Sequence, residues 1–455
     1  MLSARIERVT ASAAFDFAAL RAREFARLDA QGLAYLDYAA TALYAASQLR
    51  AHHALLAGGV FGNPHSESRP SREAAAVIER ARRELLAWFD VDDASHAVCF
   101  TANASAAIKL VAESYGFGPR AGLVVAADNH NSVNGVREYA RRAGAPIRVL
   151  PLDRELRLAD AEAHLAAAAR RGRGLVALPA QSNFSGVRHP LALVGRARAL
   201  GFEVLLDAAA FVPSERLSLA ACPADFTVLS FHKLFGFPTS VGALVVRRDA
   251  LARLRRPWFA GGTVVFASVA ADRHRLHRGH AGFEDGTPDF LGIAALAPGF
   301  ALLGEVGAAR LAEHTAQLTR HLLDELAALQ HTGGAPLVQI YGPRDLRDRG
   351  ATVALNLCDA RGAAIPYTAV EARARDAGVA VRGGCFCNPG AAEAAFGLEP
   401  AQLAACLDAS DEDFSPTRLA GCVGRAVGAV RLSLGLASNR GDVGRAVAVM
   451  ASFAG

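Results

Sequence analysis

The amino-acid sequence predicts an α/β protein whose large domain contains a mostly parallel, seven-stranded sheet. Between residues 96 and 246, short apolar runs alternate with Ala-rich stretches of helical length. The apolar runs are continuous, which is typical of strands that helices cover on both faces. Polar residues follow most of these runs directly. The seven expected strands are His96–Phe100, Leu123–Ala127, Ile147–Leu150, Leu175–Pro179, Val204–Asp207, Phe226–Leu229 and Ala243–Val246.

The chain before the sheet is expected to be helical apart from one short strand. Apolar residues at helical spacing predict an amphipathic arm over residues 1–30. Leu33–Asp37 is typical of a strand, and residues 45–90 are typical of helices. A break is expected at Phe61–Ser66, because the Gly and the Asn-Pro pair in this stretch are poor at continuing a helix.

Helices are expected to connect the strands of the sheet. A stretch of helical length follows each of the first four apolar runs. The expected helices are Ser105–Tyr115, Val133–Ala143, Ala159–Arg170 and Leu191–Ala199.

A smaller α+β domain is expected after the sheet. A helical stretch, roughly Leu291–Leu329, leads into it. Its expected strands and helices are Leu337–Tyr341, Thr352–Leu357, Thr368–Ala377, Val379–Val381, Val430–Leu434 and Val443–Phe453. We place the large domain at residues 31–300 and the small domain at residues 1–30 and 301–455. The small domain is expected to carry a mobile cysteine loop, residues 382–390.

Composition and charge exclude several classes of protein. Of 455 residues, 52% are hydrophobic and 20% charged, which is typical of a protein with an ordinary core. The net charge of +5 comes from scattered arginines, without the basic block of a nucleic-acid-binding face. Lys109 and Lys233 are the only lysines, so a lysine directly after a buried strand needs an explanation.

The seven cysteines argue against a disulfide framework, because their number is odd and they are widely scattered. The N-terminal stretch, residues 1–24, carries acidic residues and has no apolar run long enough for a secretory signal. No apolar run approaches the roughly 18 residues that a membrane span needs. We therefore expect a cytoplasmic protein that is not inserted in a membrane.

Polar residues at the carboxyl ends of the expected strands should meet in one crevice, where such sheets bind their ligands. Each could also be a helix cap or a turn residue, but their convergence favours a site. They are Thr101–Ser105, Asp128–Ser132, Gln181–Ser185, Asp207 and Ser230–Lys233. Burying an unpaired ammonium is costly, and a lysine bound as an imine to a carbonyl cofactor avoids that cost.

Pyridoxal 5'-phosphate (PLP) accounts for the residue types in this crevice. Its phosphate favours a helix N-terminus and hydroxyl groups, which predicts one cradle at Ala104 and Ser105 and another at Ser230 and His232. Asp207 would keep the ring nitrogen protonated. His130 would stack on the ring, and Asn183 or Gln181 would donate a hydrogen bond to its phenolic oxygen.

A second group of candidate residues lies in the stretch from Arg382 to Gly390. The Cys385-x-Cys387 pair could be half of a zinc site, but no second Cys or His pair lies at ligand spacing nearby. Cys385 could be a buried structural thiol. Cys387 lies among Gly, Asn and Pro residues, so an exposed, nucleophilic thiol is expected. Arg382 offers a fork for a substrate carboxylate, although it could equally be a solvated arginine.

Several strings resemble the class V aminotransferase superfamily, and within it the cysteine desulfurases. The closer resemblance is to the N-terminal domain of the molybdenum cofactor sulfurases. It spans the chain from Tyr35 to the last helix. The strings are Tyr35–Ala40, Gly62–Ser66, Asn129–Val133, Pro179–Gly186, Leu206–Phe211, Ser230–Thr239, Phe283–Thr287 and Gly384–Gly390.

The resemblance implies a fold-type-I PLP enzyme that is a homodimer, in which Thr287 reaches the phosphate of the neighbouring subunit. It implies that Lys233 holds PLP, that L-cysteine is the substrate, and that Cys387 takes its sulfur as a persulfide while alanine is released. His130 would stack on the ring and move a proton. Arg382 and Asn183 are the substrate-binding candidates.

Two departures leave the sulfur acceptor open. The eukaryotic sulfurases continue into a further domain that handles the molybdenum cofactor, whereas this sequence ends at Gly455, so a separate acceptor protein or cofactor carrier is expected. A third cysteine that is usual after their cysteine loop is replaced by Ala391 and Ala392. Two alternatives remain: a C–S or C–Se lyase that acts by elimination without a persulfide, and a catalytically silent sulfur carrier.

Overall fold

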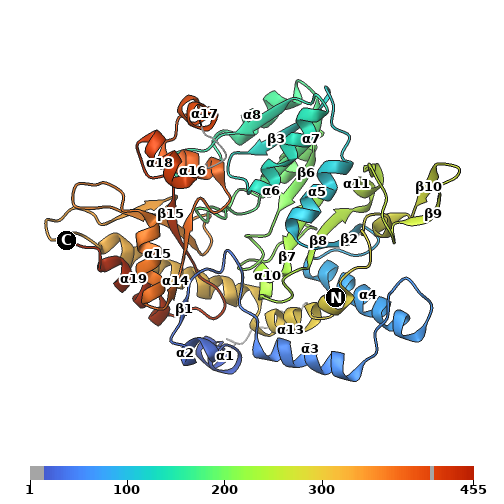
Figure 1. Ribbon diagram of the computed structural model, residues 1–455, viewed down its shortest axis with the longest axis horizontal. Coiled ribbons are helices and arrows are strands. Elements are labelled where there is room, and N and C mark those ends of the chain that lie inside the picture. The colour runs from blue at the N-terminus through green and yellow to red at the C-terminus, as the bar shows by residue number, and fades with distance from the viewer. Residues whose placement is uncertain (1–14, 410–414) are drawn as a thin grey trace, which may run out of the picture.

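The computed structural model describes residues 15–409 and 415–455. These residues form two regions of helices and strands that lie side by side (Figure 1). The large region contains the expected seven-stranded sheet, in the order β2-β8-β7-β6-β5-β3-β4. Its strands are β2 (His96–Thr101), β3 (Ala121–Ala126), β4 (Ile147–Leu150), β5 (Arg173–Pro179), β6 (Glu203–Asp207), β7 (Phe226–Ser230) and β8 (Gly242–Arg247).

The sheet is mostly parallel, as predicted. The pairs β3–β4, β3–β5, β5–β6 and β6–β7 are parallel, whereas β8 runs antiparallel to both β7 and β2. In the parallel register, Asp207 at the end of β6 lies opposite Pro179 of β5 and Val228 of β7. The carboxyl ends of these three strands therefore meet at one edge of the sheet.

Helices cover both faces of this sheet, which explains the continuous apolar strands. Successive residues of one strand belong to different cores: Leu205 packs with α5, whereas Leu206 packs with α4, α8 and α9. Both leucines are almost fully buried. The helices of this region are α3 (Ala46–Gly58), α4 (Arg69–Trp88), α5 (Ala104–Ser114), α6 (Asn131–Asn134), α7 (Val136–Arg142), α8 (Ala161–Ala169), α9 (Ala192–Ala199), α10 (Phe231–Phe235), α11 (Arg248–Arg253), α12 (Phe290–Ile293) and α13 (Leu296–Val306).

The small region is built on a four-stranded antiparallel sheet in the order β11-β12-β15-β14. Helices α14, α15 and α19 pack on it and contribute to its apolar core. Its elements are α14 (Ala308–Ala328), β11 (Val338–Tyr341), β12 (Thr352–Leu357), α15 (Tyr367–Asp376), β13 (Val379–Ala380), β14 (Arg382–Gly384), α16 (Pro389–Phe396), α17 (Pro400–Asp408), α18 (Pro416–Val423), β15 (Ala429–Ser433) and α19 (Arg440–Ala451).

The N-terminal segment joins the two regions. It forms α1 (Phe17–Glu24), α2 (Arg27–Ala30) and β1 (Ala34–Tyr35). Leu20 of α1 lies in the core of the large region, whereas β1 pairs with β13 of the small one. Arg21 reaches Asp442 of α19 at 2.5 Å. The division at residue 30 is therefore less sharp than expected, and the first 14 residues of the predicted arm lie outside the described residues.

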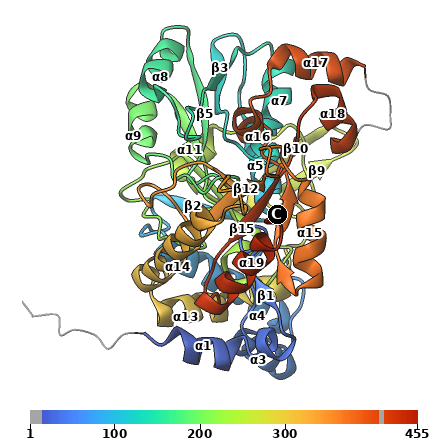
Figure 2. The same ribbon diagram turned by 90° about the vertical axis from the view of Figure 1, so that its left-hand side faces the viewer.

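A disulfide joins Cys406 of α17 to Cys422 of α18, a single bond that the argument against a disulfide framework did not anticipate. These two helices lie beside α16, which follows the cysteine loop (Figure 2). The sequence pattern missed the bond because the two residues come together only when α17 and α18 fold back on each other. Cys99, Cys222, Cys358, Cys385 and Cys387 are free thiols.

A hairpin of β9 (Val264–Ser268) and β10 (Arg273–Leu276) stands out from the large region, on the side away from the small one (Figure 1). A short 3₁₀ helix, Gly279–Gly282, follows it. Among the described residues no single helix is long and apolar enough to cross a membrane. One pair, Phe290–Val306 with Ala308–Ala328, meets that test by length and composition only as two pieces bent by 71°.

Candidate active site

Lys233 lies at the carboxyl end of β7, on the short helix α10 that begins directly after Ser230. Its side chain is only partly accessible. Burial lowers the pKa of the Lys233 ammonium below its usual value, and the nearby Asp207 carboxylate opposes this change. The other lysine, Lys109, is exposed and pairs with Glu113 on the same helix. The site lysine therefore differs from the ordinary one in its burial and in its acidic neighbour.

Some of the residues predicted to share the crevice act electrostatically on Lys233. Asp207, Arg431, Cys387 and Arg382 all act electrostatically on its amine, although they come from three different strands and the cysteine loop. Asp207 and Lys233 likewise act on His130. The strand-end residues of the large region and the cysteine loop of the small region thus meet at one place.

His130 caps α6, and its hydrogen bonds fix the state of its ring. The backbone N–H of Ser132 donates to Nδ1 at 3.1 Å, so Nδ1 is an acceptor and the ring carries its proton on Nε2. Burial and the neighbouring Lys233 lower the pKa of His130 below its usual value. A neutral imidazole at this position can accept or donate a proton near pH 7.

The predicted phosphate cradle at the start of α5 is partly occupied by contacts within the chain. The Ala104 N–H donates to Ser230 Oγ at 2.8 Å, and Ser105 Oγ lies 2.5 Å from Ser132 Oγ. The amide of Ala104 therefore orients Ser230, rather than pointing freely into the crevice as expected. The hydroxyls of Ser105, Ser132 and Ser230 gather at this helix N-terminus, which favours an anion.

Two further residues, His232 and Gly242, bear on this predicted cradle. The Nδ1 atom of His232 is buried and has no partner among the residues that the structure describes. At Gly242, a Cβ atom would lie 2.4 Å from the backbone of Asn103, so only glycine lets β8 approach the start of α5. A buried ring nitrogen without a partner, two residues along the chain from Ser230, is a group that a phosphate could satisfy.

The cysteine loop holds Cys387 exposed but anchored. Phe386 and Cys387 have φ angles of +55° and +56°, in the left-handed region that side chains disfavour. The Asn131 N–H donates to the Cys387 carbonyl at 2.7 Å, and Asn183 Nδ2 donates to the Phe386 carbonyl at 2.7 Å. These contacts hold the loop in the conformation described, and the mobility that the Gly, Asn and Pro content predicts stays a prediction.

The amide of Asn183 serves the cysteine loop, which differs from its expected role toward the cofactor and the substrate. Its Nδ2 bonds to Phe386, and its Oδ1 accepts from Asn388 at 2.9 Å. Gln181, the alternative donor, is used elsewhere: its Nε2 donates to the Ala210 carbonyl and its Oε1 accepts from Arg188.

Two arginines converge on Asp37 at the edge of the crevice. Arg382 Nε lies 3.1 Å from Asp37 Oδ2, and Arg431 Nη2 lies 3.1 Å from Asp37 Oδ1. The Arg382 side chain is half exposed, whereas the Arg431 side chain is buried. Arg431 was not identified from the sequence. The sequence did contain a signal for it, because Arg431 is a charged residue within the otherwise apolar stretch from Ala429 to Leu432.

Thr287 contacts Asn63 rather than the residues around Lys233. Asn63 Nδ2 donates to Thr287 Oγ1 at 3.1 Å, and Thr287 is exposed. The segment that carries Thr287 is held by Glu284, which accepts from the Phe100 N–H at 2.6 Å and pairs with Arg82 at 2.6 Å. Within one chain, Thr287 is thus presented outward.

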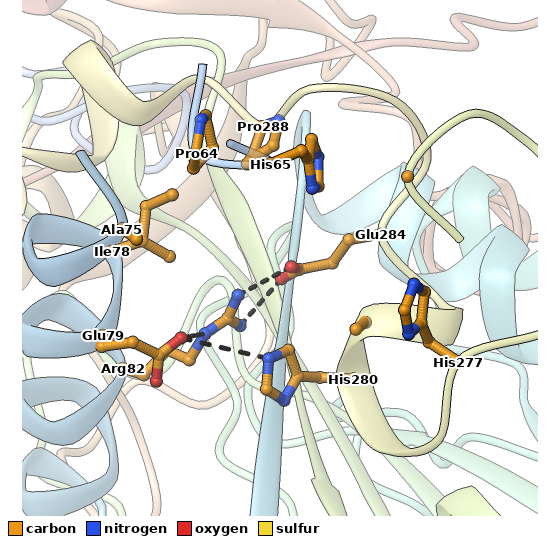
Figure 3. Close-up of a pocket in the computed structure, with 12 residues that line it drawn as sticks. Pro64, His65, Ala75, Ile78, Glu79, Arg82, His277, His280, Glu284 and Pro288 are labelled. Atoms are coloured by element: carbon orange, nitrogen blue, oxygen red, sulfur yellow. Dashed lines mark hydrogen bonds and ion pairs between the residues drawn. The ribbon is translucent and has the colours of Figure 1, made fainter. Parts of the chain in front are cut away.

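The cavity in Figure 3 lies beside Glu284 and Arg82, which hold the segment that carries Thr287, and its lining does not include Lys233. It has a volume of about 260 Å³ and lies between α4 and the segment near Glu284. Its carboxylates are already paired: Arg82 binds both Glu284 and Glu79, and His280 lies 4.0 Å from Glu79 (Figure 3). These contacts within the chain therefore pair the charged side chains of the cavity without a ligand.

Cys385 does not share the environment of Cys387. Its Sγ donates to the Val427 carbonyl at 2.8 Å, and burial raises the pKa of its thiol. Among residues 15–409 and 415–455, no group of three or more His, Cys, Asp or Glu side chains is arranged to hold a metal ion. The two cysteines therefore have different roles, and Cys387 is the accessible thiol.

Comparisons with known proteins agree with this arrangement. Residues 34–445 match the family model described as aminotransferase class-V. The chain is 39% identical over 448 residues to the molybdenum cofactor sulfurase of Anopheles gambiae, covering 91% of this chain and 56% of that protein. It is 36% identical over 452 residues to the Homo sapiens protein of the same name, covering 93% of this chain and 50% of that protein. The chain thus spans about half the length of these relatives.

Solved structures confirm the predicted fold. A cysteine desulfurase from Thermococcus onnurineus superposes with a TM-score of 0.78 at 23% identity, covering 96% of this chain and 97% of that chain. One from Escherichia coli superposes with a TM-score of 0.76 at 22% identity, covering 96% and 98%. The family match, which extends over the crevice and the cysteine loop, shows that this chain belongs to the aminotransferase class-V family.

Proposed function

We propose that this protein is a PLP-dependent cysteine desulfurase that takes sulfur from L-cysteine as a persulfide on Cys387 and releases alanine. The observation that carries the proposal is the meeting of three groups in one crevice. These are the partly buried Lys233 with its lowered pKa, the Asp207 carboxylate, and the exposed thiol of Cys387. A thiol near a lysine that holds PLP would have a role in sulfur chemistry that a transaminase does not need.

The residues present fit PLP. Lys233 Nζ would hold it covalently, and Asp207 would pair with its ring nitrogen. The hydroxyls of Ser105 and Ser230, with the unpartnered Nδ1 of His232, would bind its phosphate. His130 would lie against its ring. When bound, PLP supplies a place for the electron pair that remains after a proton leaves the substrate Cα.

The side chains of this chain would then do the following. Lys233, with a pKa that burial has lowered, accepts the Cα proton on Nζ and returns one to the product. His130, neutral because its pKa is lowered, would accept the thiol proton at Nδ1 and give up the hydrogen bond that Nδ1 accepts from the Ser132 N–H. Cys387 Sγ attacks the substrate sulfur. The carbon–sulfur bond of cysteine breaks, a sulfur–sulfur bond forms on Cys387, and proton uptake at the substrate carbon yields alanine.

Two arginines would bind the substrate carboxylate. Arg431 is buried and held in place by Asp37 and by the Asn183 carbonyl at 2.8 Å. Arg382, the candidate from the sequence, lies at the mouth and shares Asp37. Because its fork is already oriented by two partners, Arg431 loses little freedom on binding a carboxylate.

We also propose a homodimer in the cytoplasm and a molybdenum-cofactor or other acceptor for the sulfur. The relatives named molybdenum cofactor sulfurase support this acceptor. The outward-facing Thr287 and the apolar side chains exposed nearby on the β9–β10 hairpin support the dimer. Val265, Phe266 and Val269 are 59%, 69% and 99% exposed. Such apolar exposure is typical of a surface that another chain covers.

The experiment that tests the function combines two variants with product analysis. Cys387→Ala should keep the visible absorbance of bound PLP and lose persulfide formation, whereas Lys233→Ala should lose the band of lysine-bound PLP. Wild-type protein should convert L-cysteine to alanine. Pyruvate and ammonia in place of alanine would show an elimination lyase, and the absence of any cysteine-dependent spectral change would show a silent carrier.

A further inference from the structure

A buried polar cluster lies directly under the cysteine loop. The Asp128 carboxylate is fully buried and both of its oxygens are used. Oδ1 accepts from Ser182 Oγ at 2.8 Å and from Asn388 Nδ2 at 2.6 Å, and Oδ2 lies 2.8 Å from His189 Nε2. Ser182, His189 and Asn388 are each no more than 5% exposed. A carboxylate so far from water needs all of these partners.

The His189–Asp128 pair has a defined orientation. Nδ1 of His189 is buried without a partner in the described part of the chain, so Nε2 is the nitrogen that donates to Asp128. This histidine does not contact the crevice through any other hydrogen bond of its ring. Its one polar contact serves to fix the direction of the Asp128 carboxylate.

Asn388 connects this pair to the nucleophile. It follows Cys387 directly in the chain, and its Nδ2 bonds to Asp128 and to Asn183 Oδ1. The loop needs such external contacts, because Phe386 and Cys387 both adopt positive φ angles. The carbonyls of these two residues are held by Asn183 and Asn131. Three successive loop residues, 386–388, are thus hydrogen-bonded to Asn183, Asn131 and Asp128 of the large region.

We propose that Asp128 and His189 are positioning residues for Cys387: His189 orients Asp128, which holds Asn388 and thereby keeps the Cys387 thiol facing Lys233. The proposal rests on the proposed function in taking Cys387 as the sulfur-accepting nucleophile. Neither residue contacts the reacting atoms, so their effect falls on the rate of sulfur transfer rather than on the binding of cysteine or PLP.

Enzyme kinetics provide the first test, using protein loaded with PLP. In His189→Ala, kcat for alanine formation should fall about tenfold, while KM for L-cysteine stays within about twofold and the absorbance of bound PLP is unchanged. His189→Gln retains an N–H donor and should recover most of the lost rate. A wild-type kcat in His189→Ala, or an equal loss in kcat and in cysteine binding, would overturn the proposal.

Amide hydrogen exchange provides a second test that needs no activity. The Asn131 N–H is bonded to the Cys387 carbonyl, so exchange in residues 129–134 reports whether the loop is held. His189→Ala should speed this exchange without changing β6 and β7. If wild-type protein forms no alanine, the proposed function fails, yet the exchange comparison still decides whether the cluster holds the loop.

His331 offers a matched control. It is also 5% exposed, and its Nε2 lies 2.9 Å from the Cys358 carbonyl in the small region, so its removal costs a similar buried contact. His331→Ala should leave both kcat and the exchange of residues 129–134 unchanged. If His189→Ala does not fold, Asn388→Ala removes the other end of the contact and should reproduce the loss in kcat. Unchanged kcat and exchange in Asn388→Ala would contradict the proposal.

Discussion

Arg431 is the residue whose environment departs furthest from what its type usually has. An arginine that is 2% exposed and bonded to Asp37 and to the Asn183 carbonyl is fixed before any substrate arrives. Burial lowers the pKa of the Arg431 guanidinium, with Asp37 opposing the change. Its Nε has no partner among the described residues, which leaves one donor of the fork available.

We expect Arg431→Ala to reduce kcat/KM for L-cysteine more than Arg382→Ala does. A charge-assisted hydrogen bond contributes about 1.5–3 kcal/mol, which corresponds to roughly 10- to 150-fold. The buried Arg431 should lie near the upper end and the half-exposed Arg382 near the lower end. Steady-state assays of alanine release measure both effects.

Arg431→Lys separates charge from geometry, since lysine keeps the charge and lacks the planar fork. Its kcat/KM should lie between the values of wild type and Arg431→Ala. The exposed Arg196 pairs only with Glu162 at the surface, so Arg196→Ala should have no effect. An Arg431→Ala variant as active as wild type would exclude a role in binding the carboxylate.

The sequence predicted the chemistry of individual residues better than their contacts. Lys233, Asp207 and His130 were found because each follows a buried strand. Asp128 and His189 were not assigned a role, because Asn388, the loop partner of Asp128, lies 260 residues further along the chain. Short-range patterns contain no information about such a contact. Asn183 was recognised as a site residue, but only the folded loop shows that its amide binds Phe386.

At the level of elements, α17 and α18 form a hairpin. In the chain it lies after the cysteine loop and before β15, the strand that carries Arg431. Its core is small: Val423 and Val427 pack with Cys406 and with a few partly buried leucines. The Cys406–Cys422 disulfide closes a loop with a sequence separation of 16. A cross-link of this length stabilises a chain by about 3 kcal/mol, which is large for so small a core.

Breaking this disulfide should loosen the hairpin without unfolding the sheets. In Cys406→Ser, amide exchange in α17 and α18 should increase, and dithiothreitol should have the same effect on the wild type. Cys222→Ser, which alters a buried free thiol, is the control and should leave the exchange of α17 and α18 unchanged. Equal exchange in reduced and oxidised protein would show that the apolar contacts suffice on their own.

The strands illustrate where element prediction succeeds. All seven were located because helices cover both faces and leave each strand apolar. The direction of β8 was not apparent, since an antiparallel strand buried on both faces has the same composition as a parallel one. The disulfide was missed for a related reason: sixteen residues of separation do not reveal that two helices run side by side.

For the whole molecule, the stability should depend on pH through its buried histidines. Burial lowers the pKa of His96, His130, His232, His280 and His314 below the usual value of about 6.5. Below pH 6.5 the unfolded chain therefore binds more protons than the folded one, and the free energy of unfolding falls. The thermal midpoint should be level from pH 8 to about 6.5 and decrease from there toward pH 5.5.

His314 provides the comparison for this prediction. It stacks on Phe17 at 3.8 Å and bonds to the Ser438 carbonyl, so it links the N-terminal helix to the C-terminal segment. His314→Phe keeps an aromatic ring and removes the titration, so its midpoint should decrease less steeply below pH 6.5. A midpoint in the wild type that does not change between pH 8 and 5.5 would contradict the prediction.

The anchored cysteine loop has a consequence for how sulfur would leave the protein. As long as these contacts hold the loop at three successive residues, the terminal sulfur of a persulfide would extend only about 2 Å beyond Cys387 Sγ. An acceptor therefore has to bring its own reactive atom into the mouth of the crevice. Sulfur delivery would depend on the shape and reach of the acceptor. A partner too bulky to enter would receive no sulfur, however tightly it bound elsewhere on the surface.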